Sequence, residues 1–284
     1  MPQKKKPSGN SAPVAERRPR RRTGGITLTH VAKLAGVSPI TASRALNTPD
    51  KVSSDALERV KAAVKRTGYV PNMLAGGLAS SRSRLVAAIV PTIAGSVFLD
   101  MVQSLTETLS DAGYQLILGQ TGYDTTREDS LLDAIIGRRP DGIVITGVMH
   151  SKHARQRLRA SGIPIVETWD LTDHPIDMLV GFSHEKTGAA IARYAHEHGY
   201  RHPAVISADD PRAKRRADAF VKTIKRLARG TQVAVHWVSA PTNIKQGRAG
   251  LSQLLADRPE TDCVFCSSDL LALGVLTEAH ARRI

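Results

Sequence analysis

Short apolar runs alternate with amphipathic stretches along most of this chain, from residue 85 onward. The runs have the length of buried strands, and the stretches between them carry apolar residues at the spacing of one helix face. Strands that alternate with helices build parallel sheets covered on both faces, so this region is predicted to be α/β. The expected strands are LVAAIV (85–90), YQLILG (114–119), DGIVIT (141–146), IPIVET (163–168), DMLVGF (177–182), PAVISA (203–208), QVAVHWV (232–238) and DCVFCS (262–267). The expected helices span 97–113, 184–199, 212–228, 244–257 and 269–283.

Residues 26–71 follow a different pattern, with three short apolar stripes at helical spacing. The boundary signals are a cap at Thr27, a left-handed turn at Gly36, a cap at Ser38 before Pro39, a cap at Ser53 or Ser54, and a stop at Gly68. Serine and threonine side chains accept hydrogen bonds from the first turn of a helix, and proline is tolerated at its first position. Three short helices with a tight turn between the first two predict a helix-turn-helix unit.

The charge of the chain lies almost entirely at its N-terminal end. Residues 1–84 carry 17 Lys and Arg against 4 Asp and Glu, whereas residues 85–284 are nearly balanced, within a total of +14. This distribution favours a nucleic-acid-binding head on a neutral body. Residues 1–25 are basic, rich in Pro, Ser and Gly, and predicted to be a disordered tail. They lack the apolar segment of a signal peptide, so the protein is expected in the cytoplasm, associated with the nucleoid.

Signals for catalysis, metals and cofactors are missing from the sequence. The nucleophile elbow, the Walker loop and the dinucleotide fingerprint are all absent. Cys263 and Cys266 lie on one predicted strand without a second pair, which favours a buried core over zinc binding. The ten histidines form no metal-ligand grouping. The chain is therefore predicted not to be an enzyme, with no catalytic residue, metal or cofactor.

The motifs of the chain resemble those of the lactose-repressor (LacI/GalR) family. TLTHVAKLAGVSPITASRALN, then VS and GYVPN, resemble the family's DNA-binding head, and PTIAGSVF, GYQLIL, DGIVIT and SSDLLALG resemble its body. PIVETWD, VGFSHE and GYD are most similar to gluconate-utilisation repressors. The resemblance implies a two-lobed, periplasmic-binding-protein-like body, operator DNA and a small polar effector as partners, and a homodimer. It also implies a repressor that the effector releases from DNA, although an activator stays open.

The N-terminal end of the second helix of such a head lies in the DNA major groove. Pro39 and Ile40 can contact a thymine methyl, and Arg44 can pair bidentately with guanine. Thr29, Ser38, Thr41, Ser43 and Asn47 suit phosphate oxygens. The resemblance adds Thr27, Leu28 and Asn72 to the predicted DNA-binding residues. It also implies a hinge helix in which Leu78 wedges into the minor groove and Ala75 permits close approach. Gly76 and Gly77 depart from that pattern, and a plain flexible linker is the alternative.

Side chains beyond the carboxyl ends of the predicted parallel strands are the candidates for ligand binding. By position and by resemblance, these are Ser96, Phe98, Glu167, Trp169, Asp170, Phe182, Arg216 and Asp269. A sugar acid needs a cation for its carboxylate, which Arg216 or nearby Arg212 can supply, and acceptors for its hydroxyls. Arg216 could instead be solvated, and Asp269 could only cap a helix. A purine, a pentose or a phosphorylated sugar is the alternative effector, and a transport-type sugar-binding protein the remote alternative.

The predicted organisation has four parts. These are the tail 1–25, the helix-turn-helix domain 26–71, the hinge or linker 72–84, and the effector-binding and dimerisation domain 85–284, with lobes of about 85–183 and 184–284. Members of the family usually continue with further strands beyond the point that corresponds to Ile284. We therefore expect a second lobe that is incomplete and a dimer that is weakened.

Overall fold

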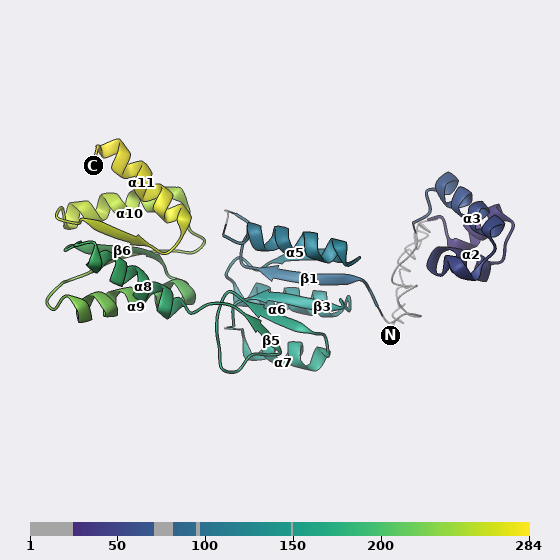
Figure 1. Cartoon of the computed structure of the whole chain (residues 1–284), viewed down its shortest axis with the longest axis horizontal. Helices are drawn as coiled ribbons and strands as arrows, with labels where there is room; N and C mark the ends of the chain where they lie inside the picture. The colour runs from purple at the N-terminus through teal and green to yellow at the C-terminus, as the bar shows by residue number, and fades with distance from the viewer. Residues whose placement is uncertain (1–24, 71–81, 95–96, 149) are drawn as a thin grey trace, which may run out of the picture. The chain divides into compact units, whose positions relative to one another are not determined.

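A computed structural model of the chain describes residues 25–70, 82–94, 97–148 and 150–284. Contacts divide the chain into two compact units, Met1–Ser80 and Ser81–Ile284, which are considered separately below. None of the described helices is both long enough and apolar enough to cross a membrane. Figure 1 shows the elements of each unit, many of them labelled.

The N-terminal unit is a three-helix head with a helix-turn-helix. Its elements are α1 (Leu28–Ala35), α2 (Pro39–Asn47), the 3-10 turn η1 (Pro49–Lys51) and α3 (Ser54–Thr67). Gly36 ends α1 with φ +63°, and Ser38 caps α2 by accepting a hydrogen bond from the Thr41 N–H at 3.1 Å. The core is made of small side chains: Val31, Ala32, Ala35, Ala42, Ala45, Val60 and Ala63. The predicted turn, the stripes and the side-chain caps at Ser38 and Ser53 are confirmed, whereas Thr27 is the N-cap of α1 with its hydroxyl 3.1 Å from His30 Nδ1.

The strands of the C-terminal unit form two wholly parallel sheets in the part of the chain that is described. The first has the order β2-β1-β3-β4-β5 and the second the order β7-β6-β8. The strands are β1 (Leu85–Val90), β2 (Gln115–Gln120), β3 (Gly142–Thr146), β4 (Ile165–Thr168), β5 (Met178–Val180), β6 (Pro203–Ala208), β7 (Ala234–Val238) and β8 (Cys263–Cys266). The α/β class and the eight predicted strands are confirmed.

Helices cover both sheets, and each sheet with its helices is called a lobe here. The first lobe has α5 (Leu99–Asp111), α6 (Thr125–Ile136) and α7 (Lys152–Ser161). The second has α8 (His184–Glu197), α9 (Pro211–Leu227), α10 (Ile244–Asp257) and α11 (Asp269–Arg282). In Figure 1, α8 and α9 lie on one face of the β6 sheet and α10 and α11 on the other. Val205 packs toward the first pair and its neighbour Ile206 toward the second, because strand side chains alternate between faces.

Candidate DNA interface and ligand cleft

The start of α2 presents an exposed tip to solvent. Ile40 is 65% exposed, although it belongs to a well-formed helix, and Pro39 and Arg44 are exposed beside it. Ala42 and Ala45, on the opposite side of α2, are buried in the head's core. The helix therefore directs an apolar tip and one arginine away from its own core, as a groove-reading helix requires.

The polar side chains of α2 are held by one another. The Ser38 and Thr41 hydroxyls lie 2.9 Å apart, and Asn47 donates through Nδ2 to the Ser43 carbonyl oxygen at 3.0 Å. At the start of α1, the exposed Thr27 N–H donates to His30 Nδ1 at 3.2 Å, beside partly buried Leu28 and exposed Thr29. These polar side chains are held by hydrogen bonds within the head itself. The predicted hinge residues Asn72, Ala75 and Leu78 lie outside the described residues.

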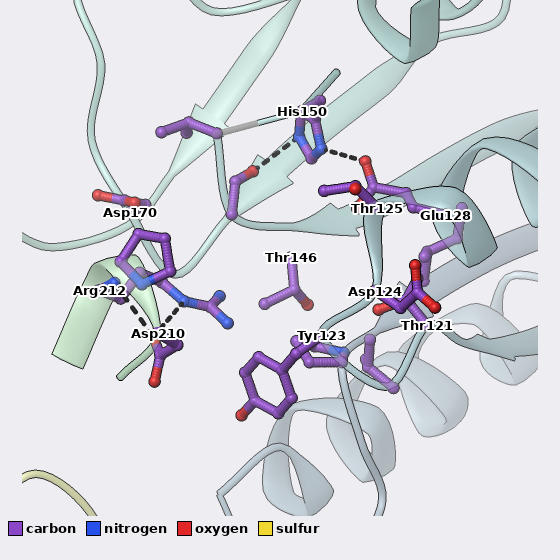
Figure 2. A pocket seen from close by; sticks show the side chains of 16 residues that line it. Thr121, Tyr123, Asp124, Thr125, Glu128, Thr146, His150, Asp170, Asp210 and Arg212 are labelled. Atoms are coloured by element: carbon purple, nitrogen blue, oxygen red, sulfur yellow. Dashed lines mark hydrogen bonds and ion pairs between the residues drawn. The ribbon is translucent and has the colours of Figure 1, made fainter. Parts of the chain in front are cut away.

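A polar cleft lies where the carboxyl ends of the strands of both lobes meet. It consists of two adjoining chambers that share Tyr123, Asp210 and Arg212. The first chamber, of about 190 Å³, is lined mainly by residues that follow β1, β2 and β3, and Figure 2 shows its side chains. The second chamber, of about 380 Å³, lies against the start of α9 and α11. The volume of the second chamber falls within the range of pockets that bind small molecules.

An aromatic wall lines the second chamber. Phe98 and Trp169 meet edge to face with ring centroids 4.9 Å apart, and Trp169 meets Phe182 in the same way at 5.7 Å. Trp169 has φ +65° and donates through Nε1 to the sulfur of Met101, which fixes the ring. The structure thus brings together three of the residues predicted from the sequence, while Ser96 lies outside the described residues.

Arg216 reaches the second chamber from α9. Its Nη1 donates to His184 Nδ1 at 2.8 Å, and its Nη2 donates to the Ser267 carbonyl oxygen at 2.9 Å. Burial lowers the pKa of Arg216 from its usual value, although the group stays charged in the neutral range. Asp269 is the first residue of α11 and lines the same chamber as Arg216 of α9. A half-buried cation and an exposed carboxylate therefore line the same chamber.

Helices α8 and α9 touch at the level of Arg216. Gly188 of α8 is buried, and a Cβ at this position would overlap the carbonyl oxygen of Arg216. The backbone of α9 can lie so close only because this position has no side chain. Gly188 therefore sets the depth from which the Arg216 side chain reaches into the chamber.

Asp170 lines the first chamber, but its carboxylate is already bonded. Only 1% of the residue is exposed, Arg215 of α9 forms an ion pair with its Oδ2, and the Leu171 N–H donates to its Oδ1 at 2.8 Å. Because Asp170 follows β4 and Arg215 belongs to α9, this pair joins the two lobes. Asp170 was predicted to accept hydrogen bonds from effector hydroxyls. The structure corrects this prediction, because both oxygens of the carboxylate already have partners within the protein.

Glu167 is not in the cleft, and its predicted role there is wrong. It is fully buried and lines neither chamber. Its Oε2 accepts from the Ile176 N–H at 2.5 Å, and its Oε1 lies 3.6 Å from both His150 Nε2 and Arg155 Nη1. The side chain points into the first lobe, because strand residues alternate in direction and Glu167 falls on the inner face of β4.

The first chamber contains two buried polar atoms without a hydrogen-bond partner among the described residues. They are the Thr146 hydroxyl and Arg212 Nη1. Figure 2 shows the Arg212 side chain directed between Thr146 and Tyr123. Burial is the main cause that raises the pKa of the Tyr123 hydroxyl, so this group remains a hydrogen-bond donor at neutral pH. Unpartnered buried polar atoms are costly, so their presence indicates a place for a ligand or water oxygen.

Several lining residues were not among those predicted from the sequence. Tyr123 and His184 lie in the motifs GYD and VGFSHE, which carry the resemblance as whole motifs and do not single out these two side chains. Asp210, Thr242 and Ser267 gave no signal of their own. Asp210 caps α9 by accepting from the Arg212 and Ala213 N–H groups, both at 3.1 Å. Asp210 lies in the cleft because it comes just after the carboxyl end of β6. Ligands of parallel α/β sheets bind beyond such strand ends, so this position was a possible candidate from the sequence.

A groove-reading head joined in one chain to two parallel α/β lobes around a polar cleft defines a ligand-responsive DNA-binding regulator. Residues 27–72 match the family described as bacterial regulatory proteins of the lacI family. Residues 83–283 match the family described as periplasmic binding proteins and the sugar binding domain of the LacI family. The chain belongs to the LacI family of transcriptional regulators and is not an enzyme.

The relatives are regulators of the same architecture. The chain is 34% identical to the HTH-type transcriptional regulator GntR of Pseudomonas aeruginosa, over 93% of this chain and 77% of that protein. A LacI-family regulator from Silicibacter pomeroyi is 34% identical, with a TM-score of 0.85 over 91% of this chain and 78% of that one. The lac repressor dimer bound to operator shares the fold, with a TM-score of 0.74 at 21% identity over 91% and 78%.

Proposed function

We propose that this protein is a repressor whose affinity for operator DNA is controlled by a sugar acid such as gluconate. The observation that carries the proposal is the half-buried guanidinium of Arg216 in a chamber with an aromatic wall and a carboxylate. The motifs similar to gluconate-utilisation repressors and the 34% identity to a regulator named GntR support the same effector. The place of action is the cytoplasm, where operator DNA lies.

Each part of a sugar acid has a partner in the second chamber. The ligand carboxylate pairs with Arg216, whose N–H groups are not all used by His184 and Ser267. The ligand hydroxyls donate to Asp269, which is exposed at the start of α11. The C–H face of the ligand packs on Trp169 and its aromatic neighbours. The effector contacts both lobes and so changes the stability of the closed cleft relative to the open one.

The DNA-binding residues proposed for the head follow from the exposed tip of α2. Pro39 and Ile40 contact base edges by shape and Arg44 pairs with guanine, while the polar residues of α1 and α2 bind phosphates. The protein acts as a homodimer on a pseudo-palindromic operator, as the lac repressor dimer is seen on its operator. The effector weakens DNA binding, and by linkage the operator weakens effector binding by the same factor.

A phosphorylated sugar or sugar acid is the second candidate effector. The observation that favours it is Arg212 Nη1, buried and unpartnered in the first chamber beside the Thr146 hydroxyl. Phosphate oxygens accept hydrogen bonds from both kinds of group, a guanidinium cation and a hydroxyl. The nearby carboxylates Asp124 and Glu128 count against a second anion. They are engaged by the Thr126 N–H at 2.8 Å and by His150 at 2.7 Å, respectively.

Calorimetry with gluconate, glucose and 6-phosphogluconate tests the proposal. Gluconate is expected to bind, and glucose, which has no carboxylate, is expected to bind much more weakly. Tighter binding of 6-phosphogluconate would assign Arg212 to the phosphate. Operator fragments chosen by binding-site selection then report whether the bound ligand releases DNA. Absence of heat with all sugar acids, in protein that binds its operator, would exclude this effector class.

Arg44→Ala is expected to relax base preference at one position in each half-site. The bidentate pair with guanine contributes about 1–3 kcal/mol of discrimination, and alanine cannot replace it. Binding-site selection with the purified variant measures the change. Arg66→Ala, which removes an exposed charge from the end of α3, is the control and should keep the wild-type preference. An unchanged selected sequence for Arg44→Ala would show that this arginine does not read a base.

A further inference from the structure

One buried histidine connects the arginine proposed to bind the effector to the opposite lobe. His184 is the first residue of α8 and only 1% exposed. Its Nε2 lies 2.9 Å from the Trp169 carbonyl oxygen, and its Nδ1 lies 2.8 Å from Arg216 Nη1. The ring also meets Phe182 edge to face at 5.0 Å. The chain of contacts runs from the first lobe through His184 to the guanidinium.

The two neighbours determine which imidazole form fits. A carbonyl oxygen can only accept a hydrogen bond, so Nε2 must carry a proton. A guanidinium can only donate, so Nδ1 must offer its lone pair. The neutral ring with a proton on Nε2 satisfies both contacts. A second proton on Nδ1 would face the guanidinium N–H and replace a hydrogen bond with repulsion between two cations.

The charged groups around His184 come from three elements. Arg216 and Arg215 face it from α9, Asp170 Oδ1 lies 3.9 Å from Nε2 beyond β4, and Glu185 follows it on α8. Burial is the largest cause that lowers the pKa of His184 below its usual 6.5, and Arg216 and Arg215 lower it further. Asp170 and the Trp169 carbonyl oppose this shift but do not reverse it. The neutral ring is therefore the form present at neutral pH.

We propose that His184 is a positioning residue that holds Arg216 in the pose for the effector's anionic group only while its imidazole is neutral. Effector affinity then depends on pH through a residue that need not touch the ligand itself. The inference rests on the proposed role of Arg216 in effector binding. Acid protonates His184 and displaces the guanidinium from Nδ1. The affinity is therefore constant above the His184 pKa and falls as the pH drops through it.

Two substitutions of His184 distinguish the contribution of Nδ1 from that of Nε2. Asparagine places its Oδ1 close to the position of Nδ1, so His184→Asn keeps an acceptor for Arg216 and loses the bond to Trp169. Glutamine extends to the position of Nε2, so His184→Gln keeps a donor for Trp169 and loses the acceptor for Arg216. Neither side chain titrates. His196→Asn, on the exposed surface of the same helix, is the matched control.

Calorimetry with gluconate from about pH 7.5 to about pH 5.0 measures the effect, because this range extends to the acid side of the usual histidine pKa of 6.5, where the lowered pKa of His184 is expected. Wild type and His196→Asn should lose about tenfold in affinity across this range. His184→Asn should bind nearly as wild type does at neutral pH and lose that dependence. His184→Gln should bind about tenfold more weakly at every pH. Gluconate itself stays ionised throughout the range, so its own titration does not contribute.

Nitrogen-15 NMR of the histidine rings tests the positioning role without any ligand. Free wild-type protein should show His184 as the Nε2–H tautomer, and Arg216→Met should raise its pKa by removing the donor and the charge. If gluconate fails to bind at any pH while these signals appear, the proposed effector is wrong and the positioning role stands. A charged ring or a proton on Nδ1 at neutral pH would overturn the inference. So would equal gluconate affinity and equal pH dependence in wild type and His184→Asn.

Discussion

Arg216→Ala is expected to abolish the response to effector while the affinity for operator DNA stays within about twofold of wild type. The guanidinium forms charge-assisted hydrogen bonds with the ligand carboxylate, each contributing about 1.5–3 kcal/mol, so losing a bidentate pair weakens binding by about a hundredfold or more. Operator binding is retained because the head folds around its own core, which contains no residue of α9. Titration of gluconate into the variant, with and without operator, gives both affinities.

A charge-matched control distinguishes this role from a general electrostatic effect. Lys225 is exposed on the same helix, so Lys225→Ala removes one positive charge and should leave gluconate affinity unchanged. Arg216→Lys keeps the charge but not the planar fork, and we expect an intermediate affinity. Arg216→Ala also leaves the Ser267 carbonyl oxygen without its donor, so thermal unfolding is measured alongside. A normal gluconate titration in Arg216→Ala would refute the proposed carboxylate contact.

Gly188→Ala is expected to destabilise the second lobe by about 3 kcal/mol. Helix propensity alone predicts the opposite sign, since alanine in a helix is favoured over glycine by about 0.5–1 kcal/mol. The close packing of α8 on α9 should prevail, because the added methyl group would overlap a backbone carbonyl oxygen that cannot rotate away. Denaturant unfolding followed by circular dichroism measures the change in the free energy of unfolding.

The matched control for this substitution lies on the exposed side of the same helix. Ala190→Gly changes only helix propensity and should cost about 1 kcal/mol. Gly188→Ala should also shift α9 and weaken gluconate binding, because the overlapping oxygen belongs to Arg216. A Gly188→Ala protein that is more stable than wild type would show that α8 and α9 do not pack this closely.

The local signals of the head predicted its structure almost completely. Gly36, Ser38 and Pro39 act within one helical turn of themselves, so their effect does not depend on residues far away in the chain. The strands were equally predictable, because a short apolar run before an amphipathic stretch indicates a buried strand followed by a helix. Helix ends were less certain: α5 begins at Leu99, two residues after the expected start at Val97. Its partly exposed apolar stripe gave no sharp boundary.

The candidate site was predictable only as a list of positions beyond strand ends. Phe98, Trp169 and Arg216 line the second chamber as expected, but Glu167 faces the interior of the first lobe and Asp170 pairs with Arg215. Successive side chains of a strand point to opposite faces, so a shift of one residue would reverse the direction of the Glu167 side chain. The strand pattern around Glu167 did not show which direction it takes. His184 was overlooked because it belongs to no metal motif, although the histidine contacts residues from three elements.

The sequence by itself determined the class of protein, the head with its exposed tip, and the order of strands and helices. The class follows from motifs that resemble those of a known family, whereas the head and the order of elements follow from periodicity and capping, which act between residues close together in the chain. Only the tertiary structure decided which polar groups face the cleft and which are already bonded. The partners in those bonds are distant in sequence: Asp170 meets Arg215 across 45 residues, and Arg216 meets Ser267 across 51. A charge is available to a ligand only after such contacts are known, because burial and pairing are properties of the folded chain.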